Sequence, residues 1–215
     1  MKGSSMYIPP HFEVSDRAWV LDLIERHPFG SLVTCEEESA RVSHLPLIAQ
    51  ERQEEIWLIG HVARNNPHAQ SIVAQAAATL VFRGPHAYIS ASWYEEPYDT
   101  VPTWNYTAVH VAGRLRQYDA WDAVKLLSAK LEGERPDAWD PQRLDPRYRD
   151  SQLRGIVAFE MRAEAFYGKA KLSQNRTEAD RARVIAKLSA SANQIDRECA
   201  EAMVELPQAG HVLLD

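Results

Sequence analysis

The stretch TWNYTAVHVAGRLRQY, residues 103–118, is the longest strand signal in the sequence. Val109, Val111, Gly113 and Leu115 fall on one face of an extended chain, and the residues between them fall on the other face. We therefore predict one long strand over residues 103–118.

Three further strand candidates lie upstream at close spacing, over residues 29–35, 41–49 and 55–62. The connectors between them, EEESA and QERQE, are short and charged. Short connectors favour antiparallel pairing, because parallel neighbours need long crossovers. The strand over 55–62 is apolar on both faces, so we expect it inside the sheet. Pro46 removes a ladder donor from the strand before it, which indicates an edge or a bulge.

The remaining pattern is a mixture of helices and strands. We expect helices over 15–27, shortly after Pro67, over 120–131 and, as one long element, over 177–205. We expect strands over 78–83 and 87–90, with a turn at Gly84–Pro85 between them. Further on we expect a solvated loop with one turn of helix over 132–151, a strand over 155–166 and a polar connector over 169–176. Mostly antiparallel strands with few intervening helices predict a mainly β, α+β fold or a closed barrel.

Composition is that of an ordinary globular protein. The 215 residues are 45% hydrophobic and 25% charged, which suits one well-buried domain with an added helical segment. No apolar run is long enough for a membrane span, and the start MKGSSMYIPPHF lacks the apolar region of a signal peptide. The two cysteines, Cys35 and Cys199, lie far apart and favour a reducing cytoplasm. The net charge of −6 argues against DNA as an autonomous partner, while a local basic patch stays open.

Residues 61–67, HVARNNP, leave a buried strand and enter a helix. Amides at a helix N-terminus bind anions, and Arg64 could hold a phosphate through two hydrogen bonds. An ordinary helix start at Asn66–Pro67 with a surface arginine explains the same residues. From this segment alone, the ordinary helix start is the better interpretation.

Aromatic residues gather between Gly84 and Tyr106, beside several hydroxyl and amide side chains. A planar ring such as isoalloxazine needs apolar walls and a few hydrogen-bond partners at its edge. Core and subunit interface are the default explanation for most of these aromatics, because Trp and Tyr are enriched at interfaces. Trp104 and Asn105 could serve both purposes.

The segment KAKLSQNR, residues 169–176, holds three cations and three polar side chains. It could contact phosphate or nucleic acid, although from the residues alone a solvated loop is favoured. Cysteine and histidine spacings typical of zinc sites are missing, as are the Walker A, Rossmann and G-x-S-x-G motifs. The sequence therefore names no catalytic residue and no metal site.

Successive motifs along the chain resemble the PaiB-type family of FMN-binding negative transcriptional regulators. They are MYIPPHF, HPFGSLVT, SHLPL, GHVARNNP, FRGPHAYISASWYE, VPTWNYTAVHVAGRLR and KAKLSQNR, in the order of the family. Strings such as GPHAYIS, VPTWNY and KLSQNR are far more specific than a lone glycine motif. The resemblance extends from Met6 to about residue 190.

The resemblance implies a pyridoxamine-phosphate-oxidase-like split β-barrel with peripheral helices and a C-terminal helix. Such barrels form homodimers that hold FMN in the cleft between subunits. In the wider superfamily the flavin phosphate lies near the end of the third strand, which corresponds to Arg64 and its neighbours here. The implied flavin contacts are His61, Ala63, Arg64, Asn65, Asn66, Thr103, Trp104, Asn105, Lys171, Ser173 and Gln174.

Domain organisation and activity follow as expectations. Residues 6–176 are expected to form the flavin-binding barrel, and residues 177–215 are expected to form a C-terminal helical extension. Met6 is a suitable translation start, so residues 1–5 are expected to be a leader or cloning remnant. The family name implies repression, but the sequence lacks a helix-turn-helix with a basic recognition helix. A flavin-dependent oxidoreductase, a haem protein using His86 or His110, and a barrel without cofactor stay open as alternatives.

Overall fold

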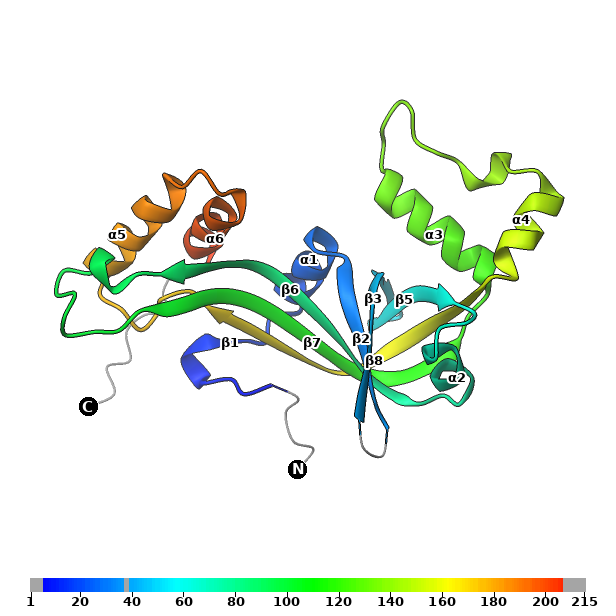
Figure 1. Cartoon of the computed structure of the whole chain (residues 1–215), viewed down its shortest axis with the longest axis horizontal. Helices are drawn as coiled ribbons and strands as arrows, with labels where there is room; N and C mark the ends of the chain where they lie inside the picture. Colours follow the sequence, from blue (N-terminus) through cyan, green and yellow to red (C-terminus); the bar gives the residue numbers. More distant parts are fainter. Residues whose placement is uncertain (1–5, 37–38, 207–215) are drawn as a thin grey trace. The chain divides into compact units, whose positions relative to one another are not determined.

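The computed structural model describes residues 6–36 and 39–206, which form an eight-stranded sheet and several helices (Figure 1). The strands are β1 (Glu13–Val14), β2 (Phe29–Glu36), β3 (Ser39–Pro46), β4 (Ile48–Arg52), β5 (Glu55–Ala63), β6 (Ala77–Ile89), β7 (Thr103–Gln117) and β8 (Ile156–Lys171). The helices are α1 (Arg17–Arg26), α2 (His68–Val73), α3 (Ala120–Glu132), α4 (Pro146–Leu153), α5 (Glu178–Ser189) and α6 (Gln194–Glu205). Short 3-10 helices cover Pro10–Phe12, Ala91–Trp93 and Pro141–Arg143.

The strand order is β3-β2-β6-β7-β8-β5-β4, and β1 pairs with β8. The predicted long strand is β7, and the predicted interior strand is β5, which pairs antiparallel with both β4 and β8. β2 and β3 form an antiparallel pair in which Phe29 lies opposite Pro46. Pro46 ends β3, which stands first in this order and is therefore an edge strand, so the predicted edge position is confirmed.

Two strand predictions were wrong. The expected turn at Gly84–Pro85 is absent, because both residues are buried within the continuous strand β6. Proline lacks only its own N–H, so it continues a strand wherever no donor is needed. The expected strand over 41–49 breaks at Leu47, whose backbone N–H donates to the carbonyl of Pro28 at 2.8 Å. The chain therefore passes from β3, which pairs with β2, to β4, which pairs with β5.

The segment after residue 166 also differs from the prediction. Lys169 to Lys171 close β8 rather than forming a connector, and Ala170 and Leu172 are buried. The expected single helix over 177–205 is divided into α5 and α6, which lie side by side (Figure 1). The division is stabilised by Asn193, whose side-chain oxygen accepts a hydrogen bond from the N–H of Ile195 at 3.1 Å and begins α6.

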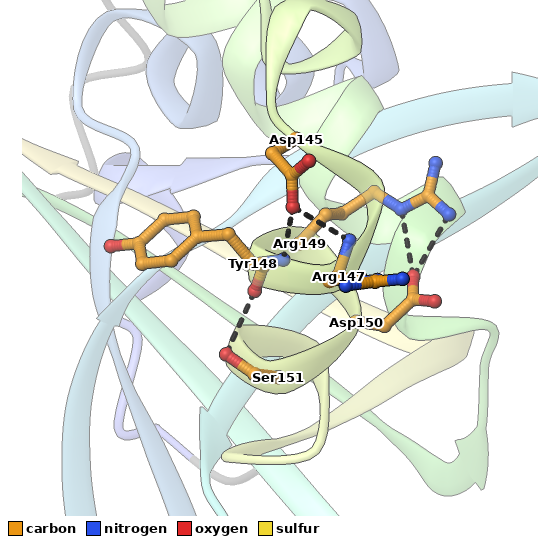
Figure 2. A network of polar contacts seen from close by, with 6 residues as sticks. All are labelled: Asp145, Arg147, Tyr148, Arg149, Asp150 and Ser151. Atoms are coloured by element: carbon orange, nitrogen blue, oxygen red, sulfur yellow. Dashed lines mark hydrogen bonds and ion pairs between the residues drawn. The ribbon is translucent and has the colours of Figure 1, made fainter.

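The stretch 132–151, expected to be a loop with one turn of helix, contains most of α4, which is eight residues long. Asp145 begins this helix by accepting hydrogen bonds from the N–H groups of Arg147 and Tyr148, each at 3.0 Å (Figure 2). Pro146 occupies the first helical position, where its missing donor costs nothing. Such an Asp-Pro pair is a helix start, and the high charge of the segment masks it.

The chain divides by packing into two compact units, each assembled from separate stretches. The first takes its described residues from 1–20, 83–109 and 167–215, and the second from 21–82 and 110–166. The core of the first includes Ile89 of β6, Leu172, Leu188 of α5 and Met203 of α6. The core of the second joins β4, β5 and β8 to α3. Within the described residues, no helix is both long and apolar enough to cross a bilayer.

Candidate functional site

The predicted site residues fall into one group in each unit. Residues 61–66 lie at the end of β5 and before α2, in the second unit. Residues 103–105 and 171–174 lie at the start of β7 and at the end of β8, in the first unit. The second of these groups is joined by direct side-chain contacts between segments that are distant in sequence.

Lys171 links the end of β8 to the start of β7. Its ammonium group donates to the hydroxyl of Thr103 and, at 3.0 Å, to the backbone carbonyl of Trp104. Burial lowers the pKa of Lys171, and the positive charges of Lys169 and Arg176 lower it further. A negatively charged ligand beside this ammonium would offset both effects.

Asn105 and Ser173 form a buried polar pair. Asn105 Nδ2 donates to Ser173 Oγ at 2.9 Å, and that hydroxyl lies 3.3 Å from Asn105 Oδ1, to which it can donate. Ser173 has a φ of 64°, a left-handed conformation that is uncommon for residues other than glycine. The pair thus holds the turn that follows Lys171, and protein surrounds both side chains.

Gln174 closes the same turn from within. Its side-chain oxygen accepts from the N–H of Leu172 at 2.7 Å, and its Nε2 donates to the carbonyl of Ala170 at 2.6 Å. These two hydrogen bonds provide partners for the backbone N–H of Leu172 and the backbone carbonyl of Ala170, two buried residues. Gln174 therefore fixes the position of Lys171 at the strand end.

Lys169 belongs to this site but is missing from the flavin contacts that the resemblance implies. Its side chain is 6% exposed, and its ammonium donates to the carbonyl of Tyr7 at 2.8 Å. The ammonium also lies 5.2 Å from the ring centre of Tyr106 and 5.6 Å from that of Tyr7. The signal that could have found it is the i, i+2 spacing of Lys169 and Lys171, because alternate residues of a strand share a face.

An aromatic surface adjoins the start of β7. Trp104 is 48% exposed, and its ring stacks on that of His86 with centres 5.9 Å apart. Tyr88 is 50% exposed and lies 6.1 Å from Trp104, centre to centre. Burial, followed by the charge of Arg83, lowers the pKa of His86, while Asp196 opposes the shift. A flat, largely apolar surface of this kind can stack against a planar ligand.

The group in the second unit is occupied mainly by structural contacts. Arg64 donates from Nε to the carbonyl of Arg154 at 2.5 Å and from Nη2 to that of Ile156 at 2.9 Å. Asn66 accepts from the N–H of His68 at 2.9 Å, so an early amide of α2 already has a partner. Ala63 and Asn65 are exposed.

His61 occupies the last part of β5. Burial lowers the pKa of its imidazole, so the ring is neutral at neutral pH. Among the residues that the structure describes, Nδ1 of His61 is buried without a hydrogen-bond partner. A buried ring nitrogen of this kind would gain free energy from a polar group of a ligand.

The arrangement fits a ligand that joins a planar ring to a phosphate. Lys169 and Lys171 offer cationic donors, and Trp104 offers a flat surface in the same unit. FMN combines an isoalloxazine ring with one phosphate group, so the residues present suit it. Within the described part of the chain, no group of three or more His, Cys, Asp and Glu side chains is placed to hold a metal ion.

Comparison with known sequences places the chain in a family. Residues 6–165 match the family described as "Putative FMN-binding domain". The chain is 36% identical over 203 residues to the protease synthase and sporulation protein PAI 2 of Bacillus subtilis (strain 168), covering 92% of this chain and 96% of that protein. It is 28% identical over 159 residues to the uncharacterized protein YKL070W of Saccharomyces cerevisiae, covering 61% of this chain and 94% of that protein.

Solved structures share the fold at low sequence identity. The flavocytochrome Anf3 from Azotobacter vinelandii gives a TM-score of 0.58 at 15% identity, covering 84% of this chain and 80% of that chain. The FAD and haem binding protein from Mycobacterium smegmatis gives 0.57 at 13% identity, covering 74% and 73%. The fold is the expected α+β split β-barrel. Given the family match over residues 6–165 and the 36% identity across 92% of the sequence, the chain belongs to the PaiB-type family of FMN-binding proteins, with FMN as its cofactor.

Proposed function

We propose that this protein is a cytoplasmic, homodimeric flavoprotein that represses transcription in a flavin-dependent manner. The observation that carries the proposal is similarity over 92% of the chain to a relative named for protease synthase and sporulation. The net charge of −6 favours a route through a partner protein over direct contact with the phosphates of DNA. DNA binding is therefore the less favoured form of the proposal.

The proposed flavin contacts are the residues predicted from the resemblance. Lys171 supplies a charged donor whose position is fixed by Thr103, Gln174 and the Asn105–Ser173 pair. Trp104 supplies a surface that excludes water from one face of the ring. The segment 61–66 supplies a second set of proposed flavin contacts. Arg64 has five N–H donors, and it donates from Nε and Nη2 to carbonyl groups of the protein, so the Nη1 group is left to contact the flavin.

FMN, when bound, supplies reversible redox chemistry through its isoalloxazine ring. This chain's residues bind and orient that group, and none of them needs to move a proton for the regulatory function. A change in flavin content or redox state would alter the contacts at Trp104 and Lys171. Those contacts join the start of β7 to the end of β8, so a change in the flavin would alter the surface formed by these two strand ends.

The flavin contacts are tested by titrating the flavin-free full-length protein with FMN. Lys171→Met should weaken binding by roughly 10- to 100-fold, since one charged hydrogen-bonded contact is lost. Lys187→Met is a matched control, because Lys187 is exposed on α5. Arg64→Ala tests the segment 61–66 in the same way. Unchanged affinity in both the Lys171 and the Arg64 variants would remove these residues from the site.

The assembly and the regulatory function need separate measurements. Light scattering should give twice the chain mass of 24.4 kDa for the homodimer, and a single chain mass would contradict that part of the proposal. Deleting the gene in its host should raise a set of transcripts, and wild-type protein should restore them while Lys171→Met should not. Unchanged transcripts after deletion would exclude repression.

A further inference from the structure

Three cations gather where β8 ends, in the first unit. Lys169 is 6% exposed, Lys171 is partly buried, and Arg176 follows in the turn. Aromatic rings line them: the Arg176 guanidinium lies 4.6 Å from the ring centre of Tyr94, and Lys169 lies beside Tyr106. Lys169 and Lys171 alternate on β8, so their side chains share a face of the strand. In the turn that follows, the N–H of Arg176 donates to the carbonyl of Ser173 at 3.1 Å. We name these three residues the β8 cation cluster.

Neither lysine of this cluster is neutralised by the protein. Among the described residues, Lys169 and Lys171 form no ion pair, and their polar partners are the neutral oxygens of Tyr7, Thr103 and Trp104. Glu13 lies opposite Lys169 in the β1–β8 register, yet its side chain is exposed. Burying an ammonium group without a counter-ion costs free energy, and like charges nearby add to that cost. A bound anion would offset both.

We propose that the β8 cation cluster, Lys169, Lys171 and Arg176, binds the phosphate monoester of FMN. The inference rests on the proposed flavin contacts and goes further, because it places the phosphate at the end of β8 and not at Arg64. A phosphate monoester carries about two negative charges and three acceptor oxygens at neutral pH, which matches a cluster of cationic donors. Arg64, by contrast, already donates to the carbonyls of Arg154 and Ile156.

If the cluster binds the phosphate, the protein distinguishes FMN from flavins without a phosphate by its affinity for that group. FMN and riboflavin share the same ring and differ only in that phosphate. The wild-type protein should therefore bind FMN more tightly than riboflavin. In Lys169→Met, affinity for FMN should fall by roughly 10- to 100-fold while affinity for riboflavin is unchanged. Lys171→Met should reduce the preference similarly, and Lys187→Met should leave it as in the wild type.

The stability of the flavin-free variants separates ligand binding from a structural role. Lys169→Met removes a buried charge without a counter-ion together with its hydrogen bond to Tyr7, and these changes oppose each other, so its unfolding midpoint without flavin should stay close to that of the wild type. Inorganic phosphate should raise the midpoint of the wild type, raise that of Lys169→Met less, and compete with FMN. If Lys169→Met does not fold, Lys171→Met provides the same comparison.

The outcomes distinguish this inference from the proposed function. Wild-type protein that binds neither flavin would contradict the flavin site as a whole. Wild-type binding of FMN, with the preference over riboflavin kept in both lysine variants and lost in Arg64→Met, would place the phosphate at Arg64 and overturn the inference alone. Phosphate that stabilises the protein equally in all variants, or without competing with FMN, would also overturn it.

Discussion

At the scale of single residues, the Asn105–Ser173 pair supports the turn that positions Lys171. Asn105→Leu keeps the volume of the side chain but leaves the buried Ser173 hydroxyl without its partner. The free energy of unfolding should fall by about 1–3 kcal/mol, the cost of an unsatisfied buried polar group. Urea denaturation measures this loss. The double variant Asn105→Leu, Ser173→Ala should recover part of it, and a single variant as stable as the wild type would contradict the role given to the pair.

His61 gives a pH dependence with a defined sign. Burial lowers its pKa below the ordinary value of 6.5, so the unfolded chain takes up a proton more readily than the folded protein as pH falls. The contribution of His61 to stability is therefore full above pH 6.5 and is lost progressively below it. His61→Gln should show a shallower loss of unfolding free energy between about pH 7 and pH 5 than the wild type. Equal slopes in the two proteins would contradict a neutral buried imidazole.

Several site residues could be named from sequence, and Lys169 could not. Lys171, Ser173 and Gln174 were named because their motif, KAKLSQNR, resembles that of the family, whereas its residues alone favour a solvated loop. Lys169 is in the same motif, but its burial depends on Tyr7 and on the pairing of β1 with β8, which are distant in sequence. The internal bonds of Arg64 depend likewise on residues about 90 positions away along the chain.

At the scale of elements, close approach of β7 and β8 depends on Gly113. A Cβ atom at this position would overlap the backbone carbonyl of Arg162 and crowd the side chain of Met161. Because both neighbours belong to packed strands, Gly113→Ala should lower the free energy of unfolding by about 1–3 kcal/mol. Thermal unfolding of the flavin-free protein measures this effect. An unchanged midpoint would show that β7 and β8 can separate without cost.

Elements with strong local periodicity were predictable, and those decided by distant partners were not. The prediction of β7 succeeded because alternation continues over fifteen residues. The prediction of α3 succeeded because Val124, Leu127 and Leu131 fall on one apolar stripe of the helix. Gly84–Pro85 reads locally as a turn, yet burial within β6 overrides that signal. The break between α5 and α6 was not predicted, because the helical spacing of apolar residues in the sequence continues across it. In the structure, the side chain of Asn193 caps the start of α6 and so separates the two helices.

At the scale of the whole molecule, family and fold agree on a flavin-binding split barrel. The family match covers residues 6–165, which include β1 to β7 and part of β8, but it stops before Lys169 and Lys171. The match with the Bacillus subtilis relative covers 92% of this chain, so it extends well beyond that range. The C-terminal part of β8 and helices α5 and α6 complete the unit that holds the proposed phosphate site.

The most direct test of the central claim is the absorbance spectrum of the purified full-length protein, recorded before and after addition of FMN and removal of unbound ligand. We predict the two visible bands of a bound flavin, with about one FMN per chain identified by mass spectrometry of the released ligand. A protein that keeps no flavin after this treatment, although it is folded, would contradict the account.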